Sequence, residues 1–386
     1  MLSDITLHQR DRCYHKILWR ENQTDAIHAY ELNTVTYSTA CASFLAIRSL
    51  HELAELNRDK FEHASNVIKR DFYANDFLSG SFHEESTKIL REQVETILNS
   101  GGFQFRKWAS NNPNVLDGID HLSDDKIVLS HDSIKTLGIF WSPNHDFIHY
   151  SVPIYSEGKS FTQRKALSII SQIFDPMGLI GPIILKGKII MQQIWNLKLG
   201  WDDQLPNNIH DDFISYIRDI HLLNELSIKR KLSQHSNSER MELHCFCEAS
   251  ERAYAASIYL ISIHDGDKRY SNLVCAKSKV APLKVVTLPR LELSGALLLA
   301  RLLHKVKAAI NLNISHTYCW TDSTIVLAWI RAPSRTWKTF VANLVSQIQS
   351  LTDISYWNHV RSENNPADII SRGITSTELI SSTLIG

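Results

Sequence analysis

Apolar residues recur at helical spacing over several stretches of the first 232 residues. They predict helices over residues 44–54, 84–98, 165–174, 185–199 and 207–232. Short β-rich segments lie between these helices at residues 72–78, 137–141 and 148–152. We expect the first of them to form a hairpin with polar residues at its tip. The Pro and Gly residues between Asp175 and Pro182 break helical continuity and separate two of the helices.

After a polar linker at residues 233–239, strands and helices alternate. The expected strands lie at 243–248, 254–263, 271–277, 315–321 and 355–360. The expected helices lie at 290–309, 323–331, 337–350 and from 366 onward. This order suits a mixed five-stranded sheet flanked by helices, so the predicted fold class is α/β, within a multidomain α+β chain.

Length and composition set wide bounds on the chain. Its 386 residues suggest two or three domains, and 44% hydrophobic residues are ample for buried cores. The formal net charge is zero, but from Met241 onward 15 Lys and Arg stand against 11 Asp and Glu. That region is therefore mildly basic, and its net positive charge is far below that of a dedicated DNA-coating protein.

The six cysteines include no Cys-x-x-Cys pair, which favours reduced thiols and an intracellular setting, cytoplasmic or nuclear. No apolar run approaches the roughly 18 residues of a membrane span, and no signal peptide precedes the first elements. We therefore expect no membrane partner.

Four carboxylates stand at the ends of expected elements in the second half of the chain. Glu248 and Asp322 each close an apolar strand, Glu292 lies in the first turn of a long helix, and Asp368 opens the last one. Strand ends and helix starts are where an α/β sheet places its chemistry. Acidic residues gathered in this way bind hard divalent cations, because Mg²⁺ and Mn²⁺ prefer oxygen ligands. The pattern predicts a two-metal site that cleaves phosphodiesters.

Each carboxylate also has a simpler explanation. Glu292 and Asp368 could offset helix dipoles, Asp322 could cap the following helix in competition with Ser323, and Glu248 could be an ordinary solvated residue. Helical spacing, however, places Glu292 on an apolar stripe, where a carboxylate is costly unless it is paired or bound to metal. The four acids together favour a site.

Basic and aromatic residues suggest a nucleic-acid surface. Candidate phosphate-binding and stacking residues are Arg106, Lys107, Trp108, Arg331, Arg335, Trp337 and Lys338. The alternative for the last four is a solvated helix face with a packing Trp.

Several stretches resemble one family over nearly the whole chain. They are Phe174 to Pro182 (FDPMGLIGP), Lys277 to Leu283 (KSKVAPL), Leu288 to Leu293 (LPRLEL), Trp320 to Thr324 (WTDST), Trp337 to Asn343 (WKTFVAN) and Asn365 to Asp368 (NPAD). The chain resembles the pol polyprotein of Bel/Pao-type LTR retrotransposons, transposable elements, in the region known as the Pao retrotransposon peptidase family.

The resemblance implies three parts. Residues 1–125 would be part of a reverse transcriptase palm, 126–235 the thumb and connection, and 236–386 an RNase H-like domain. Glu248, Glu292, Asp322 and Asp368 would match the family's metal-binding set. The implied activity is endonucleolytic cleavage of RNA in an RNA–DNA hybrid with two Mg²⁺ (or Mn²⁺) ions.

Two positions depart from the family pattern. The polymerase hairpin of such enzymes reads Tyr-x-Asp-Asp, whereas this chain has Tyr73, Asn75 and Asp76 around Ala74. A neutral amide replaces one metal-binding carboxylate, and we expect the strand with the other catalytic Asp to lie upstream of Met1, so polymerase activity is expected to be lost.

The second departure is Glu248, where the family has Asp. Glu is longer by one C–C bond, about 1.5 Å, and a displacement of ~1 Å can lower a rate on the order of a hundredfold. Two alternatives to catalysis stay open. One is a non-catalytic nucleic-acid-binding remnant or domesticated module. The other is an aspartic peptidase, which the absence of an Asp-Thr/Ser-Gly sequence disfavours.

Overall fold

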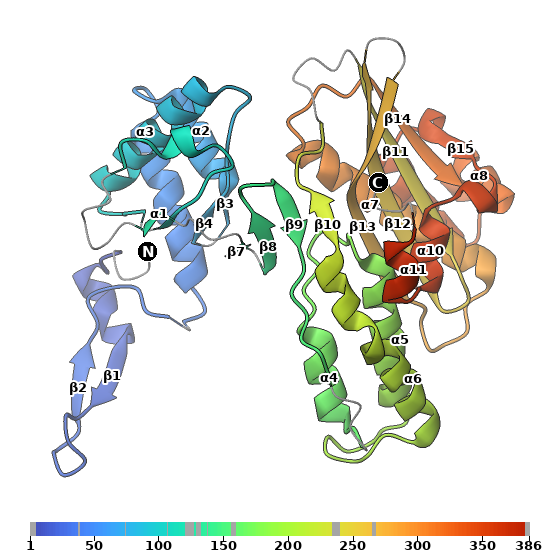
Figure 1. Cartoon of the computed structure of the whole chain (residues 1–386), viewed down its shortest axis with the longest axis horizontal. Helices are drawn as coiled ribbons and strands as arrows, with labels where there is room; N and C mark the ends of the chain where they lie inside the picture. The colour runs from blue at the N-terminus through green and yellow to red at the C-terminus, as the bar shows by residue number, and fades with distance from the viewer. Residues whose placement is uncertain are drawn as a thin grey trace. The chain divides into compact units, whose positions relative to one another are not determined.

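The computed structural model describes residues 5–37, 39–73, 75–105, 107–119, 127–128, 133–136, 138–155, 160–233, 240–264 and 268–382. The chain forms two compact units. The first comprises residues 1–136 and 142–145, and the second comprises residues 137–141 and 146–386 (Figure 1). No helix within the described residues combines the length and apolar character needed to cross a bilayer.

The first unit is built around three helices. These are α1 (Ala42–Leu56), α2 (Glu62–Asp71) and α3 (Glu84–Ser100), so the predicted helices at 44–54 and 84–98 are confirmed. Their apolar faces meet around Leu50, Ile68, Val94 and Ile97, all of which are buried. Its described residues also form the 3-10 helices η2 (Gln9–Tyr14) and η3 (Pro113–Leu116) and several short strands, which include β1 (Lys16–Trp19), β2 (His28–Glu31), β5 (Lys107–Trp108), β6 (Ile127–Val128) and β7 (Ile134–Thr136).

The predicted hairpin of the first unit is present. Strands β3 (Phe72–Tyr73) and β4 (Asp76–Phe77) are antiparallel, with Tyr73 opposite Asp76. Asn75 lies in the turn between them, while Ala74 lies outside the described residues. The polar tip follows from local chemistry, since Asn and Asp favour turn positions.

The second unit contains the predicted five-stranded mixed sheet. Its strands are β11 (Arg240–Ala249), β12 (Ala253–His264), β13 (Lys268–Val280), β14 (His316–Thr321) and β15 (Trp357–His359), in the order β13-β12-β11-β14-β15. Strand β11 pairs antiparallel with β12 and parallel with β14. The two strands that end near Glu248 and Asp322 are therefore parallel neighbours.

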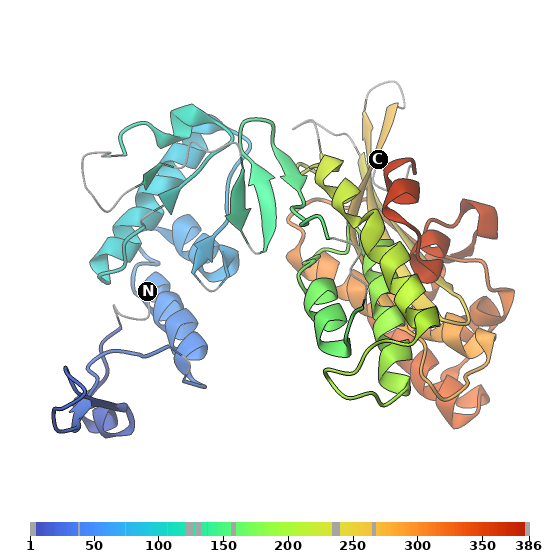
Figure 2. The same cartoon turned by 60° about the horizontal axis from the view of Figure 1, so that its bottom comes forward.

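Helices cover both faces of this sheet (Figures 1 and 2). One face packs against α7 (Leu288–Ala309), α8 (Thr324–Arg331) and α9 (Thr339–Leu351) through a core that includes Leu243, Cys245 and Cys319. Alternation along β11 and β14 explains this core, because every second side chain points to the same face. The core-facing cysteines are buried free thiols.

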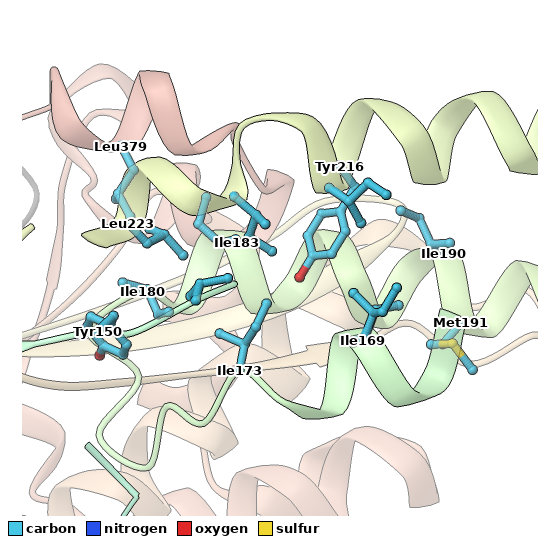
Figure 3. Packing of buried hydrophobic residues seen from close by; sticks show 14 of the residues in the cluster. Tyr150, Ile169, Ile173, Ile180, Ile183, Ile190, Met191, Tyr216, Leu223 and Leu379 are labelled. Atoms are coloured by element: carbon cyan, nitrogen blue, oxygen red, sulfur yellow. The ribbon is translucent and has the colours of Figure 1, made fainter. Parts of the chain in front are cut away.

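The other face packs against α4 (Gln163–Ser171), α5 (Gly181–Asn196), α6 (Asn207–Arg218), α10 (Ala367–Arg372) and α11 (Ser376–Ile380). Figure 3 shows part of this core, where Ile169, Ile183 and Tyr216 from three different helices meet. The same core includes Ala276 of β13 and Ile370 of α10. Residues on both sides of the polar linker thus share one core. The predicted division into a thumb/connection at 126–235 and an RNase H-like domain at 236–386 stays a prediction.

The loop after α4 lies on the edge of the sheet. Met177 O accepts a 2.8 Å hydrogen bond from the Ala276 amide of β13. Gly178 follows with a φ of 75°, and a Cβ at that position would lie 1.9 Å from Ala276 O. Only glycine permits this approach of two backbones.

One helix prediction was too long. The predicted helix over 207–232 ends at Arg218 and is followed by a 3-10 helix, η4 (Ile220–Glu225), and by strand β10 (Ser227–Lys229). Strand β10 pairs with β9 (Phe147–His149), which lies beside β8 (Ile139–Ser142). Long-range pairing overrides the local helical pattern at Ile228, which is buried between exposed neighbours.

Candidate metal centre

Three of the four predicted carboxylates meet at one end of the sheet. Glu248, Glu292 and Asp322 each offer an oxygen, and these atoms all lie within 4.8 Å of one another. Glu248 is the penultimate residue of β11, and Asp322 directly follows β14. Because these strands are parallel neighbours, their carboxyl ends bring the two side chains together.

Helix α7 brings the third carboxylate to this site through close contact with β11. Gly295 lies three residues after Glu292 and therefore on the same helix face. A Cβ at Gly295 would lie 3.1 Å from Glu248 O, which is tighter than an ordinary packing contact. The missing side chain lets α7 approach the end of β11, and this approach places Glu292 beside Glu248.

Glu248 is buried, with 6% of its surface exposed, and both of its carboxyl oxygens accept hydrogen bonds. The Ala249 amide donates to Oε1 at 2.9 Å, and Asn365 Nδ2 donates to Oε2 at 2.9 Å. Burial and, next to it, the adjoining Asp322 carboxyl raise the pKa of Glu248 to about 8. The explanation of Glu248 as a solvated residue is therefore wrong.

Asp322 has one satisfied and one unsatisfied oxygen. The Ser362 hydroxyl donates to Oδ2. Oδ1 is enclosed and has no hydrogen-bond partner. The alternative role of Asp322 as a helix cap is also wrong, because Ser323 caps α8 by accepting a hydrogen bond from the Val326 amide at 3.2 Å.

Glu292 lies beyond the first turn of α7, since that helix begins at Leu288. This position weakens the explanation that it offsets the helix dipole, whose effect is confined to the first turn. Burial raises the pKa of Glu292, and the negative charge of Asp322 raises it further, whereas a hydrogen bond with Ser323 lowers it. A cation would relieve the repulsion among the three carboxylates.

Asp368 lies on α10, next to the three-carboxylate group and outside it. Its charge contributes to the raised pKa of Glu248, so the two residues are close enough to interact. Arg372 Nε lies 2.8 Å from Asp368 Oδ1 and forms an ion pair one helical turn away. Asp368 also occupies the first turn of α10, so its favourable interaction with the helix dipole remains a second explanation.

Two hydrogen-bonded bridges tie α10 to the end of β11. At the start of the helix, the buried Asn365 donates to Glu248 and also to Cys247 O at 3.0 Å. At the end of the helix, Ser250 Oγ donates to Ser371 O at 2.8 Å. These supporting roles were not predicted from the sequence, although Asn365 and Ser250 lie within the motifs that contain Asp368 and Glu248.

The other predicted site residues belong to two segments, residues 106–108 in the first unit and residues 331–338 in the second. Arg106 lies outside the described residues, Lys107 is exposed, and Trp108 is half-buried with its ring 4.8 Å from that of Phe105. Arg335 and Lys338 are exposed. The other two residues form hydrogen bonds to the backbone of the second unit. Arg331 Nη2 donates to Trp357 O at 3.3 Å, and Trp337 Nε1 donates to Trp329 O at 3.2 Å.

Residues 162–323 match the family model described as the Pao retrotransposon-like RNaseH-like domain. The match supports a Pao retrotransposon pol fragment with an RNase H-like domain. It includes Glu248, Glu292, Asp322 and all of helices α4 to α6, and it ends before Asp368. A comparison with curated proteins found no match. An RNase H-like domain suggests a nucleic-acid partner.

Proposed function

We propose that the second unit cleaves the RNA strand of RNA–DNA hybrids in a reaction that depends on two Mg²⁺ (or Mn²⁺) ions. The observation that carries this proposal is the convergence of Glu248, Glu292 and Asp322, from three separate elements, within 4.8 Å. The Pao-type RNase H-like match over residues 162–323 supports the same reading.

The residues at the site fit a hard divalent cation. Carboxylate oxygens are the ligands that Mg²⁺ prefers. Asp322 Oδ1 is enclosed and unpartnered, so it has a free position for a cation. Bound Mg²⁺ would supply an activated water and would stabilise negative charge on the scissile phosphate.

The side chains at the site have different roles. Glu248, Glu292 and Asp322 hold the centre, and Ser362 orients Asp322 through its hydroxyl. Asp368 joins the site as a fourth ligand when its ion pair with Arg372 opens. An ion pair with two partly exposed members is weak, on the order of 0–1 kcal/mol, so this opening costs little.

We propose that the first unit does not polymerise nucleotides. Asn75 occupies the hairpin turn where the family has a metal-binding Asp. A neutral amide cannot replace the charge of that carboxylate at a two-metal site. The proposed activity therefore resides in the second unit.

One observation favours a second candidate function, a nucleic-acid-binding module without catalysis. Both oxygens of Glu248 already accept hydrogen bonds, from Ala249 and Asn365. A side chain held in this way must give up part of these bonds or share its oxygens to bind a cation. In this reading the hybrid binds and is not cut.

Cleavage of an end-labelled RNA–DNA hybrid by the purified chain tests the proposal. We expect Mg²⁺-dependent RNA fragments from the wild type and none from Asp322→Asn. Glu251→Gln, which removes an exposed carboxylate three residues after Glu248, is the matched control and should cleave normally. Hybrid binding without Mg²⁺-dependent cleavage would select the non-catalytic module instead.

A further inference from the structure

Two packed elements of the second unit carry basic residues and no acidic ones. From Pro176 to Trp201, the segment that contains α5, the sequence has three Lys and no Asp or Glu. From Lys268 to Leu291, the segment that contains β13, it has six Lys and Arg and no Asp or Glu. This separation of charge stands out in a chain whose formal net charge is zero.

Helix α5 and strand β13 lie side by side. Leu185 and Ile189 of α5 share an apolar cluster with Ala253 and Val280. Gln192 Nε2, one turn further along α5, donates to the backbone oxygen of the residue after Val280 at 2.7 Å. Ala276 and Val280 of β13 face α5, so Lys277 and Lys279, which alternate with them, point to the other side of the strand. The lysines of α5 and those of β13 therefore flank the same edge of the sheet.

The lysines of this surface repel one another. Lys277 and Lys279 are exposed and point to the same side of β13, because they are two residues apart. Burial lowers the pKa of Lys188, and the positive charge of Lys277 lowers it further, so these two side chains are close enough to interact. Like charges placed together in this way favour binding of an anion.

Little negative charge compensates these lysines. Asp175 is the acidic group that acts on Lys188, and its half-buried carboxylate already accepts hydrogen bonds from Tyr150 and from the Leu179 and Ile180 amides. Within the described residues, Lys188, Lys277, Lys279 and Lys284 form no salt bridge.

The basic surface leads to the carboxylates. The Ala281 amide, directly after β13, donates to Arg252 O at 2.8 Å, which holds the segment against the turn that follows β11. Ala249, the neighbour of Glu248, shares a small apolar cluster with Ala281 and Leu291. Residues 281–291 thus run from the lysines of β13 past the end of β11 and into α7.

At the end of residues 281–291, a further basic side chain lies near Lys338, which the sequence predicts to bind nucleic acid. The Arg290 guanidinium lies over the Phe340 ring, 5.3 Å from its centre. Phe340 is two residues from Lys338, which is exposed. Basic side chains therefore lie on both sides of the start of α7, where Glu292 joins the site.

We propose that Lys188, Lys277, Lys279 and Lys284 bind the sugar–phosphate backbone of a nucleic acid that extends from the carboxylate site along β13. We name these four residues the β13 track. The inference rests on the proposed function for the identity of the polyanion. It adds a surface that orients the substrate and that does not touch the scissile phosphate.

The test is equilibrium binding of a fluorescent RNA–DNA hybrid over a range of salt concentrations, with Ca²⁺ in place of Mg²⁺. The triple variant K188Q/K277Q/K279Q removes three track charges. We expect it to bind about 10- to 100-fold more weakly and the slope of log K against log salt to fall by about 2–3, close to one per lost phosphate contact. The variant K188R/K277R/K279R keeps the charges and should bind like the wild type.

The matched control is K229Q/K231Q/K305Q, which removes three exposed lysines elsewhere in the same unit. It should retain the wild-type affinity and slope. Equal affinities and slopes for the wild type and the track variant would overturn the proposal, as would an equal loss in the control. So would a wild type that binds no hybrid at low salt, or one that binds only phosphatidylserine vesicles or an acidic protein.

Cleavage measured in parallel separates this inference from the proposed function. Salt-dependent binding that requires the track lysines, without Mg²⁺-dependent cleavage, would refute the nuclease and support the track. Cleavage with equal KM in the track and control variants would refute the track and support the nuclease. In a nuclease that uses the track, the glutamine variant should raise KM and leave kcat nearly unchanged.

Discussion

Replacement of Asp322 by Asn should stabilise the metal-free protein while it abolishes metal binding. The Glu248 carboxyl has an ordinary pKa of 4.5, which the folded protein raises to about 8, chiefly through burial and then through Asp322. Between these two pH values the folded protein holds a proton that the unfolded chain releases. The free energy of unfolding should therefore fall as pH rises through this window, at up to about 1.4 kcal/mol per pH unit.

Over the whole window this loss amounts to at most about 5 kcal/mol. Burial is the larger cause of the raised pKa, and the Asp322→Asn substitution would remove only the contribution of the neighbouring charge. We expect a gain of about 1–2 kcal/mol for D322N above pH 8, which corresponds to roughly 2–8 °C in Tm for a unit of this size. The amide oxygen of the new side chain can still accept the Ser362 hydroxyl, so no other contact need be lost.

The assay is thermal unfolding between pH 5 and pH 9, with EDTA and then with Mg²⁺. The wild type should lose stability toward pH 9 in EDTA and regain it in Mg²⁺. D322N should lose less stability in EDTA, because burial alone still raises the pKa of Glu248, and it should gain little from Mg²⁺. Glu251→Gln, which removes an exposed charge nearby, should follow the wild type. Identical pH profiles for the wild type and D322N, or equal stabilisation of both by Mg²⁺, would refute the crowded-carboxylate account.

Three further changes give distinct outcomes. Glu248→Asp should raise the rate of hybrid cleavage by about one to two orders of magnitude, because it moves the carboxylate ~1 Å toward the family's position; an unchanged or lower rate in a gel-based cleavage assay would contradict this. Asn75→Asp should not restore primer extension with Mg²⁺ or Mn²⁺, since one carboxylate does not complete a two-metal site; any extended primer would show the polymerase argument to be wrong. Gly178→Ala should destabilise the second unit by at least about 2–4 kcal/mol in urea unfolding, because its Cβ would collide with Ala276 O; a smaller change would mean that the loop shifts freely.

Much of the second unit could be predicted from sequence because its patterns are local. Alternation along residues 243–248 and 315–321, and the apolar stripe of the long helix, each depend on near neighbours. An RNase H-like fold for residues 236–386 implies that these two strands are parallel neighbours, and β11 and β14 pair in this way. Glu248 and Asp322 then meet because the ends of neighbouring parallel strands meet, and α7 brings Glu292 to them.

Other features depend on contacts between residues that are distant in the sequence, and local patterns could not predict them. The strand at Ser227–Lys229 forms only because β9 pairs with it. The hydrogen bond from Asn365 to Glu248 joins residues 117 positions apart, and no periodicity encodes it. The two acid-free segments that carry the β13 track are visible in the sequence. That they lie side by side follows only from the packing of α5 on β13.

The loop at Met177 and Gly178 restricts how the second unit can be recombined with that of a related protein. By hydrogen bonding to Ala276, the loop covers part of an edge strand that would otherwise be free to pair with another chain. A chimaera joined between β10 and β11 would bring a foreign helical segment to this edge and to the buried face of α10. Unless the incoming segment carries its own glycine at this point, the sheet of one parent and the helices of the other should fail to assemble. Exchange of segments between related proteins should therefore be tolerated more readily at a junction before α4 than at a junction between β10 and β11.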